Sequence, residues 1–212
     1  MNVDRREGYV AEVFTSFQGE GPRVGERHLF VRLAGCNIRC RYCDTPDSLE
    51  RTARCRVDRG AAGGEWLANP LPAATLRALI EAEIAREATI DAVSFTGGEP
   101  LVQAPFLAAV LDGARLPVPV LLETNGVLPR QLERVVERID VVSMDIKPPS
   151  NTGERGFWAD HEAFLRIAAG RDLYVKLLVD AGTAVAEVER AAALVAAATP
   201  AAPLFLQPVS LA

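Results

Sequence analysis

The sequence predicts a single-domain α/β protein built around a mostly parallel sheet. Short apolar segments bounded by turn residues alternate with segments of helical periodicity, which is the pattern of repeated βαβ units. The chain has 212 residues, a length that buries a sizeable core without disulfides or a structural metal. No shift in composition and no internal repeat marks a second unit, so one domain is expected over residues 1–212.

Seven strands and five helices are expected along the chain. The strands are short apolar runs at 9–14, 28–34, 92–95, 120–124, 141–146, 173–179 and 203–207. The helices lie between them, at 73–87, 104–114, 129–138, 160–169 and 183–198. In the first helix, apolar residues recur at intervals of three and four and form a stripe that faces the sheet. Segment 50–72 has charge, glycine and proline without periodicity, so we expect an irregular surface insertion there.

The charge balance favours a small-molecule substrate. The chain carries 23 basic and 28 acidic residues, a net charge of −5, whereas proteins that bind nucleic acids or membrane surfaces normally present a basic face. The sequence also lacks an apolar run of about 18 residues and a signal-peptide core. We therefore expect a cytoplasmic protein that binds neither nucleic acid nor membrane. Lys147 and Lys176 are its only lysines.

Three of the four cysteines lie close together in the segment GCNIRCRYCD. Cys36, Cys40 and Cys43 have the spacing C-x3-C-x2-C, and closely spaced thiols in a reducing compartment are more often metal or cluster ligands than disulfides. A loop over 35–45 can wrap three thiolates around three corners of a 4Fe–4S cluster. The fourth iron then stays open to a cofactor or substrate.

The alternative is a structural zinc site in which Cys55 is the fourth ligand. Three cysteines in this asymmetric spacing, directly after a strand, favour instead a radical S-adenosylmethionine enzyme. Cys55 lies in the arginine-rich segment RTARCRVDRG. We expect it to be a loop thiol without a role.

Polar and glycine residues follow two of the predicted strands, where α/β folds place their active sites. TGGEP at 96–100 is either a simple turn or a cradle in which Glu99 and exposed amides bind a group carrying an amine and a carboxylate. ETNG at 123–126 is either a turn or a cofactor contact through Glu123 or Asn125.

The strand at 141–146 ends in polar residues that share one face. Ser143, Asp145 and Lys147 alternate along the strand, so they can line a barrel interior and bind a ribose and a carboxylate. The alternative is a salt bridge between Asp145 and Lys147.

Arg32 lies inside the otherwise apolar strand FVRLA. A charge in such a strand is costly unless it is paired, so Arg32 is expected to meet an anion such as a substrate carboxylate. The competing partner is a protein acid such as Glu20 or Asp44. The preceding segment SFQGEG has neither helical nor strand periodicity and is expected to be a loop.

Asp44 and Thr45 directly follow the last clustered cysteine. They can supply oxygen ligands to a hard cation, or Thr45 can cap a short helix. His28 and His161 are far apart in the chain, and we expect both at the surface rather than in a catalytic pair.

Together, these motifs resemble the 7-carboxy-7-deazaguanine synthase family of radical S-adenosylmethionine enzymes. The resemblance rests on FQGEG, FVRLAGC, C-x3-C-x2-CDT, TGGEP, ETNG and IKPPS, and it runs from about residue 9 to 208. It implies a partial (β/α)6-type barrel reduced in helices, with a 4Fe–4S cluster, S-adenosylmethionine and Mg²⁺. It also implies a reaction in which 6-carboxy-5,6,7,8-tetrahydropterin contracts to 7-carboxy-7-deazaguanine with loss of ammonia, in queuosine or 7-deazapurine biosynthesis.

The same resemblance implies a role for each matching residue. Cys36, Cys40 and Cys43 would ligate the cluster, and Thr45 would ligate Mg²⁺. Arg32 and Glu20 would be catalytic, with Arg32 facing the substrate carboxylate. The S-adenosylmethionine contacts would be Tyr42, Asp44, Gly98, Glu99, Ser143, Asp145 and Lys147. The pterin contacts would be Phe17, Gln18, Gly19, Glu20, Arg32 and Thr96.

Two features depart from this family's pattern. Many members read SPK where this chain reads DIK at 145–147, so the cofactor contact there shifts toward the Asp145 carboxylate. Members also commonly continue beyond the point where this chain stops, so we expect either a naturally short form or a site completed by the partner subunit of a homodimer. Flavodoxin or ferredoxin is the expected electron donor.

Two other functions remain as alternatives. One is an activase of the same superfamily that installs a glycyl radical in a partner protein. The other is a zinc-stabilised binding module without catalysis.

Overall fold

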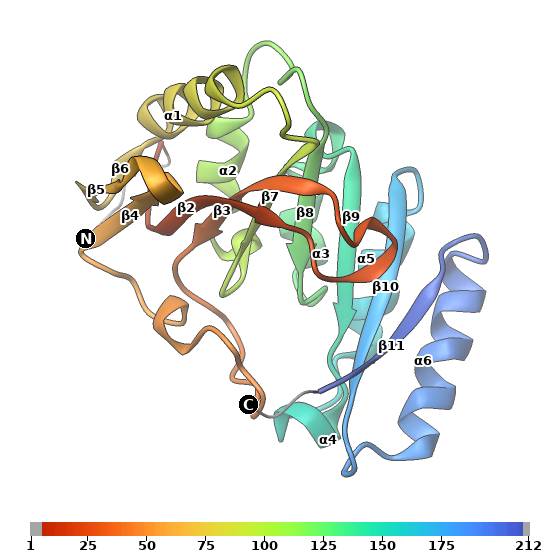
Figure 1. The fold of residues 1–212 in the computed structure, drawn as a ribbon. Coiled ribbons are helices and arrows are strands. Elements are labelled where there is room, and N and C mark those ends of the chain that lie inside the picture. The colour runs from red at the N-terminus through yellow and green to blue at the C-terminus, as the bar shows by residue number, and fades with distance from the viewer. Residues whose placement is uncertain (1–5, 210–212) are drawn as a thin grey trace.

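The computed structural model describes residues 6–209, and its main feature is a curved nine-stranded sheet with helices on one side (Figure 1). Glu7–Gly8 and Leu71–Pro72 form a separate two-stranded antiparallel sheet. The nine strands of the main sheet are, in spatial order, β11 (Leu204–Pro208), β10 (Asp172–Val179), β9 (Val141–Ile146), β8 (Val120–Thr124), β7 (Ala92–Gly97), β3 (Arg27–Leu33), β2 (Val10–Phe17), β4 (Arg54–Asp58) and β5 (Gly64–Ala68). Six of them, β3 and β7 to β11, run parallel to one another, whereas β2 is antiparallel to β3. This run of six confirms the predicted mixed α/β fold with a parallel, barrel-like core.

The secondary structure elements follow the predicted alternation. The strands are β1 (Glu7–Gly8), β2 (Val10–Phe17), β3 (Arg27–Leu33), β4 (Arg54–Asp58), β5 (Gly64–Ala68), β6 (Leu71–Pro72), β7 (Ala92–Gly97), β8 (Val120–Thr124), β9 (Val141–Ile146), β10 (Asp172–Val179) and β11 (Leu204–Pro208). The helices are α1 (Ala73–Arg86), α2 (Ala104–Val110), α3 (Pro129–Leu132), α4 (Pro149–Thr152), α5 (Trp158–Ala168) and α6 (Val185–Ala198). None of the helices in residues 6–209 is long and apolar enough to span a membrane.

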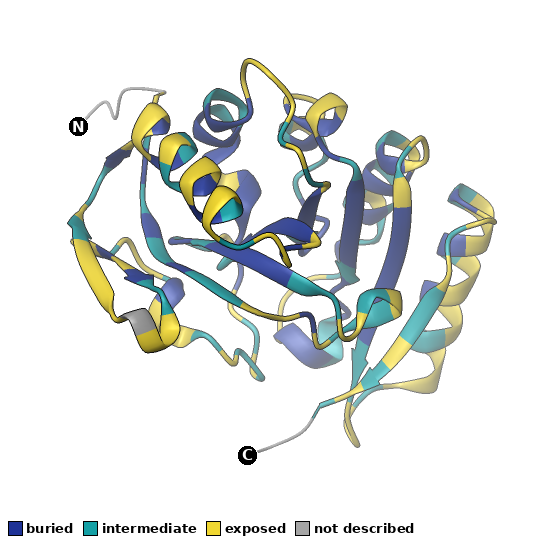
Figure 2. Ribbon diagram, turned by 45° about the horizontal axis from the view of Figure 1, so that its top comes forward, coloured by how far each residue is buried: buried dark blue, intermediate teal, exposed yellow. Residues whose placement is uncertain are grey.

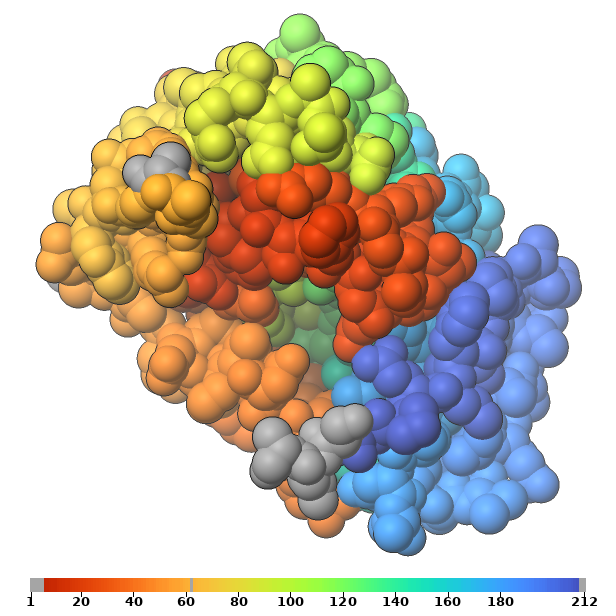
Figure 3. Space-filling model, in the orientation of Figure 1, coloured from red at the N-terminus to blue at the C-terminus, as the bar shows by residue number. Residues whose placement is uncertain are grey.

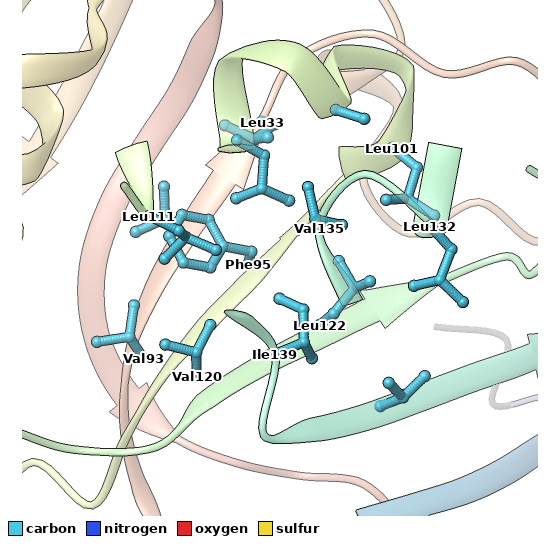
Figure 4. Close-up of a cluster of buried hydrophobic side chains, with 14 of the residues drawn as sticks. Leu33, Val93, Phe95, Leu101, Leu111, Val120, Leu122, Leu132, Val135 and Ile139 are labelled. Carbon is cyan, nitrogen blue, oxygen red and sulfur yellow. The ribbon is translucent and has the colours of Figure 1, made fainter. Parts of the chain in front are cut away.

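The two faces of the sheet differ in chemistry because side chains alternate along each strand. One face carries the main apolar core, in which Phe95, Leu122 and Val142 are fully buried. Residues of α2, α3 and α5 belong to the same core, and Figure 4 shows Phe95 beside Leu111 and Leu101 near Leu132. Figure 2 shows the buried strands flanked by helices whose outer sides are exposed. The opposite face is largely polar and is left open to a cavity.

The hairpin loop between β2 and β3 crosses the open side of the sheet. Gln18 donates to Glu123 of β8 at 2.8 Å, and Arg23 pairs with Asp172 of β10 at 2.8 Å. Gly21 lies against the ring of Tyr174, where a Cβ atom would come within 2.5 Å of that ring. The loop therefore ties the early strands to the late ones and forms part of the wall of a partial barrel.

The predicted irregular insertion at 50–72 is wrong. β4 and β5 form an antiparallel hairpin there, and β4 also pairs in parallel with β2, so the hairpin extends the sheet. The strand period was present in RCRVD, in which Cys55 and Val57 are buried while Arg54 and Arg56 are exposed. The apolar residues of this strand were too few to stand out against its charges.

Three further predictions are wrong: the exposure of Cys55, the exposure of the two histidines and the length of the helix at 129–138. Cys55 belongs to the buried core rather than to a loop, and both histidines are fully buried rather than at the surface. His28 lies within 2.7 Å of the Ser94 hydroxyl, and His161 within 3.2 Å of the Asn125 carbonyl. The helix expected at 129–138 is only the short α3 followed by a 3-10 turn at Val136–Arg138, because Val135 interrupts it in a non-helical conformation.

Candidate active site

A cavity of about 570 Å³ lies against the polar face of the sheet. It is lined by the cysteine loop, by the β2–β3 hairpin loop, by the ends of β7 to β9 and by residues of β10 and β11. Figure 3 shows a hollow between the orange segment that follows β3, the red hairpin and the blue C-terminal strand. All the predicted site residues line this cavity except Glu99 and Ser143.

The cysteine loop is held by backbone hydrogen bonds and by an apolar contact. Gly35 donates to the Ser48 carbonyl at 2.8 Å and accepts from the Glu99 amide at 2.9 Å. Gly98 packs so closely on this loop that a Cβ atom would lie 2.5 Å from the Gly35 oxygen. Ile38 is buried in a small cluster with Val127, against which Cys36 and Cys40 also pack. The thiols therefore sit on an anchored loop beside an apolar wall.

Cys36, Cys40 and Cys43 all line the cavity, whereas Cys55 lies in the main core on the other face. Burial raises the pKa of the Cys36 thiol, and it raises that of Cys40 against the opposing effect of the Lys147 ammonium. Cys55 is thus not placed to be the fourth ligand of a zinc site.

The chemistry of this donor set fits a multinuclear cluster. Within residues 6–209, no three His, Cys, Asp or Glu side chains converge on a position that could hold one metal ion. A cubane cluster does not need such convergence, because each thiolate binds a different iron atom. The three thiols on one loop, without a fourth cysteine in the cavity, match a 4Fe–4S cluster with one open iron.

Glu99 is a fully buried link between two loops rather than part of the cavity wall. Its Oε1 atom accepts from the Leu101 amide at 3.0 Å and from the Thr124 hydroxyl at 2.9 Å, and its Oε2 atom accepts from the Asn125 amide at 2.8 Å. Burial raises the pKa of Glu99 to about 7, and these donors oppose the shift. The carboxylate is committed to the protein, so the exposed part of TGGEP is the backbone at Gly97 and Gly98.

Asp145 lies between two lysines on the cavity wall. Its Oδ2 atom is 3.0 Å from Lys147 Nζ, and its Oδ1 atom is 3.3 Å from Lys176 Nζ. Although burial alone would raise it, the pKa of Asp145 is lowered by these two ammonium groups. Lys147 Nζ also lies 5.3 Å from the centre of the Tyr42 ring. The predicted Asp145–Lys147 salt bridge is present, and it borders the cavity.

The hairpin loop supplies polar groups from the other side of the cavity. Glu20 is paired with Lys176 and accepts a hydrogen bond from Gln207 Nε2 at 2.6 Å. Gln18 is buried, and its side-chain amide donates a hydrogen bond to the Glu123 carboxylate. Phe17 is 64% exposed at the cavity mouth, although it was expected to lie in a loop and is the last residue of β2.

Arg32 points into the cavity from β3 and rests on aromatic and acidic neighbours. Its Nε atom donates to Glu12 Oε1 at 2.7 Å, so its protein partner is neither Glu20 nor Asp44. Its guanidinium carbon lies 5.6 Å from the centre of the Phe14 ring, which stacks on Phe30 at 5.2 Å. This arrangement holds the guanidinium by one edge. Thr96 is paired with Arg32 in the register of β3 and β7.

Thr45 lines the cavity next to Cys43. Its backbone precedes the 3-10 turn Pro46–Ser48, but its side chain makes no capping hydrogen bond. The Thr45 hydroxyl instead lies 3.4 Å from Asp44 Oδ1. The helix-cap alternative for Thr45 is therefore wrong, and Thr45 is a residue of the cavity wall.

Sequence reasoning missed Lys176, Gln207 and Glu12, which complete the network of charges around the cavity. Lys176 had the same signal as Arg32, because it is a charged residue inside the apolar strand LYVKLLV. Glu12 had this signal too, inside the apolar run YVAEVF, whereas Gln207 is an uncharged residue at the end of PLFLQ and had no such signal.

Three comparisons place the chain among known proteins. Residues 31–187 match the Radical SAM superfamily. A protein of Geobacter sulfurreducens named 7-carboxy-7-deazaguanine synthase is 39% identical over 204 residues, which cover 95% of this chain and 81% of the relative. A Thermococcus kodakarensis protein of the same name is 34% identical over 213 residues, covering 94% and 83%.

The fold agrees with these matches. The crystal structure of QueE from Escherichia coli aligns with a TM-score of 0.61 at 23% identity, covering 96% of this chain and 85% of that one. Membership of the Radical SAM superfamily implies a 4Fe–4S cluster and S-adenosylmethionine, as the cysteine loop predicts. The chain belongs to the radical SAM superfamily and, within it, to the 7-carboxy-7-deazaguanine synthase family.

Proposed function

We propose that this protein converts 6-carboxy-5,6,7,8-tetrahydropterin into 7-carboxy-7-deazaguanine with loss of ammonia, in the biosynthesis of 7-deazapurines. The observation that carries the proposal is that one cavity contains both the three-cysteine loop and the guanidinium of Arg32. The first can hold a cluster with an open iron, and the second can hold a carboxylate. Relatives named for this reaction support the same function.

The hairpin side of the cavity is suited to the pterin. With Glu12 on its Nε atom, Arg32 keeps its terminal nitrogen atoms for a bidentate contact with the substrate carboxylate. The stacked rings of Phe14 and Phe30 give the bicyclic substrate an apolar surface. Gln18 and Glu20 are fixed by Glu123 and Lys176, so they present preorganised groups to the polar edge of the pterin.

The cysteine side is suited to S-adenosylmethionine. When bound, the cluster and this cofactor supply a carbon-centred radical by one-electron cleavage of a carbon–sulfur bond. The backbone at Gly98 and the salt-bridged Asp145 and Lys147 can accept and donate hydrogen bonds to the amino acid and ribose portions. Tyr42 covers Lys147, which limits water access to that end of the cavity.

Mg²⁺ binding at Thr45 is a further part of the proposal. The Thr45 and Asp44 oxygens border the cavity beside the last cysteine, and hard cations prefer oxygen ligands. Within residues 6–209, no three His, Cys, Asp or Glu side chains form a metal site, and in this proposal the ion takes its remaining ligands from the substrate and water. Omitting Mg²⁺ and substituting Thr45→Val should then reduce turnover without reducing iron content.

The test is anaerobic reconstitution with iron and sulfide, followed by incubation with S-adenosylmethionine, reductant, Mg²⁺ and the pterin. Mass spectrometry should detect 7-carboxy-7-deazaguanine together with 5′-deoxyadenosine. Formation of 5′-deoxyadenosine without this product would keep the superfamily and refute the substrate, as expected for an activase. A colourless protein with one bound zinc would instead support the binding module.

A further inference from the structure

Lys176 is a buried cation whose role above is limited to fixing Glu20. It lies on β10 and is 3% exposed. Burial of an ammonium group is costly unless nearby acids compensate for the lost water. Burial lowers the pKa of Lys176, but Asp145, Glu123 and Glu20 more than reverse this, so its pKa is raised. The lysine is therefore charged, and its partners define its role.

The two direct partners of Lys176 belong to opposite sides of the cavity. Its Nζ atom contacts Glu20 Oε2, which comes from the hairpin loop, and lies 3.3 Å from Asp145 Oδ1, which comes from β9. Glu20 is on the side suited to the pterin, and Asp145 is on the side suited to S-adenosylmethionine. One ammonium group thus joins the two sides.

The two carboxylates depend on Lys176 to different degrees. Asp145 keeps Lys147 on its other oxygen atom, at 3.0 Å. Among residues 6–209, Lys176 is the only cation that forms a salt bridge with Glu20, whose other oxygen atom accepts from the neutral Gln207 amide. Without Lys176, the Glu20 and Asp145 carboxylates would lie near each other with no cation between them, and Lys147 would remain only on the other oxygen atom of Asp145. Removal of Lys176 would therefore take the salt-bridge partner from Glu20 but leave Asp145 with Lys147.

We propose that Lys176 is a positioning residue that holds Glu20 and Asp145 in place together, and so sets the affinity for both the pterin and S-adenosylmethionine. This inference rests on the proposed function.

The test compares Lys176→Met with Gln207→Leu. Within residues 6–209, the Gln207 side chain hydrogen-bonds to Glu20 and not to Asp145, so Gln207→Leu should raise the KM for the pterin and leave the Kd for S-adenosylmethionine unchanged. Lys176→Met should raise both, the KM by roughly tenfold or more and the Kd by several-fold, as expected for hydrogen bonds to charged groups. The Kd is measured by equilibrium dialysis of S-adenosylmethionine with the reconstituted protein. Lys176→Arg should restore most of both affinities.

Two checks keep the result interpretable. Iron content and the unfolding temperature of each variant show whether the fold and cluster persist. If Lys176→Met does not fold, the double variant Lys176→Met/Glu20→Gln removes the unpaired carboxylate and should still bind S-adenosylmethionine several-fold more weakly than Glu20→Gln alone.

The inference is overturned if Lys176→Met, or the double variant, leaves the S-adenosylmethionine Kd at its reference value. If the wild-type protein makes 5′-deoxyadenosine but does not convert the pterin, the proposed function fails. The dialysis result then still decides whether Lys176 acts through Asp145.

Discussion

The same strands form both faces of the sheet, but one face forms the apolar core and the other lines the cavity. On β7, Phe95 points into the helix-covered core while Thr96 lines the cavity. On β9, Met144 is in the core while Asp145 is in the charge network. The core face contains apolar side chains that pack against the helices, whereas the charged groups Arg32, Asp145, Lys147 and Lys176 on the cavity face are paired with one another or with nearby acids. Substitutions on the first face should therefore act on stability, and those on the second should act on ligand binding and chemistry.

The largest difference between the two faces is expected when a cysteine on each face is replaced by alanine. Cys40→Ala removes one of three proposed cluster ligands on the cavity side, so 5′-deoxyadenosine formation should fall by at least about a thousandfold, because residual rates in the absence of a catalytic group are small. Iron content after reconstitution should fall with it, and the unfolding temperature of the protein without cluster should hardly change. Iron analysis and mass spectrometry measure these effects.

The matched control is Cys55→Ala on the core face. This substitution should leave iron content and turnover unchanged and lower the free energy of unfolding by about 1 kcal/mol, because it shortens a fully buried side chain. Loss of the cluster in Cys55→Ala would contradict the separation of the two faces.

Phe95→Ala should lower the stability of the protein without changing ligand binding, which is the reverse of the effect expected for Cys40→Ala. The ring of Phe95 is fully buried, and truncation of such a ring costs about 3–5 kcal/mol of stability. Urea denaturation checks this value. At a temperature where the variant is folded, its KM for S-adenosylmethionine should match that of the wild type. A large change in KM with little loss of stability would mean that the core face contributes directly to the site.

Glu99→Gln tests the residue that connects the faces. An amide group cannot accept from all three donors that Glu99 satisfies, so one buried N–H loses its partner, at a cost of about 1–3 kcal/mol. Because Glu99 also fixes the loop next to the cysteines, S-adenosylmethionine binding should weaken as well. Denaturation and equilibrium dialysis would show the two effects. An unchanged stability would contradict the assignment of Glu99 as a structural link.

A smaller effect is expected from His161, which should make the stability of the protein depend on pH. Burial lowers its pKa to about 4, so between pH 6.5 and 4 the unfolded chain binds a proton that the folded protein does not. Stability therefore falls as pH falls, by about 1 kcal/mol between pH 7 and 5.5 from this group. Glu99, with its pKa raised to about 7, acts in the opposite sense over the same range.

The measurement is therefore a difference between two proteins. Urea denaturation of the wild type and of His161→Gln at pH 7 and pH 5.5 isolates the histidine. The stability of the variant relative to the wild type should rise by about 1 kcal/mol on acidification. An equal response of the two proteins would show that His161 is accessible to protons in the folded state.

Predictability from sequence also differed between the faces. The apolar periodicity located the parallel strands and most helices, because burial of one side of each element determines that pattern. It failed at β4, where Cys55 and Val57 alternate with arginines, and at the two histidines, whose burial depends on partners from other elements.

On the cavity face, motifs located most of the lining but not its pairings. Arg32 was recognisable as a site residue because it is a charged residue in an apolar strand. Lys176 has the same signal in LYVKLLV, although it was not among the predicted site residues. The Arg32–Glu12 pair could not be predicted, since it depends on the β2–β3 register and on the irregularity between Val10 and Glu12. The contacts of Glu20 with Lys176 and Gln207 depend on a loop that crosses the sheet.

The most direct test of the account is the ratio of the two products in Arg32→Met. This variant removes the proposed carboxylate-binding group and leaves the cysteine side of the cavity intact. With S-adenosylmethionine, reductant, Mg²⁺ and the pterin, it should still form 5′-deoxyadenosine, while 7-carboxy-7-deazaguanine falls by about a hundredfold or more, as expected when a charged hydrogen-bonding group is lost. Unchanged formation of 7-carboxy-7-deazaguanine by Arg32→Met would contradict the assignment of the polar face to the substrate.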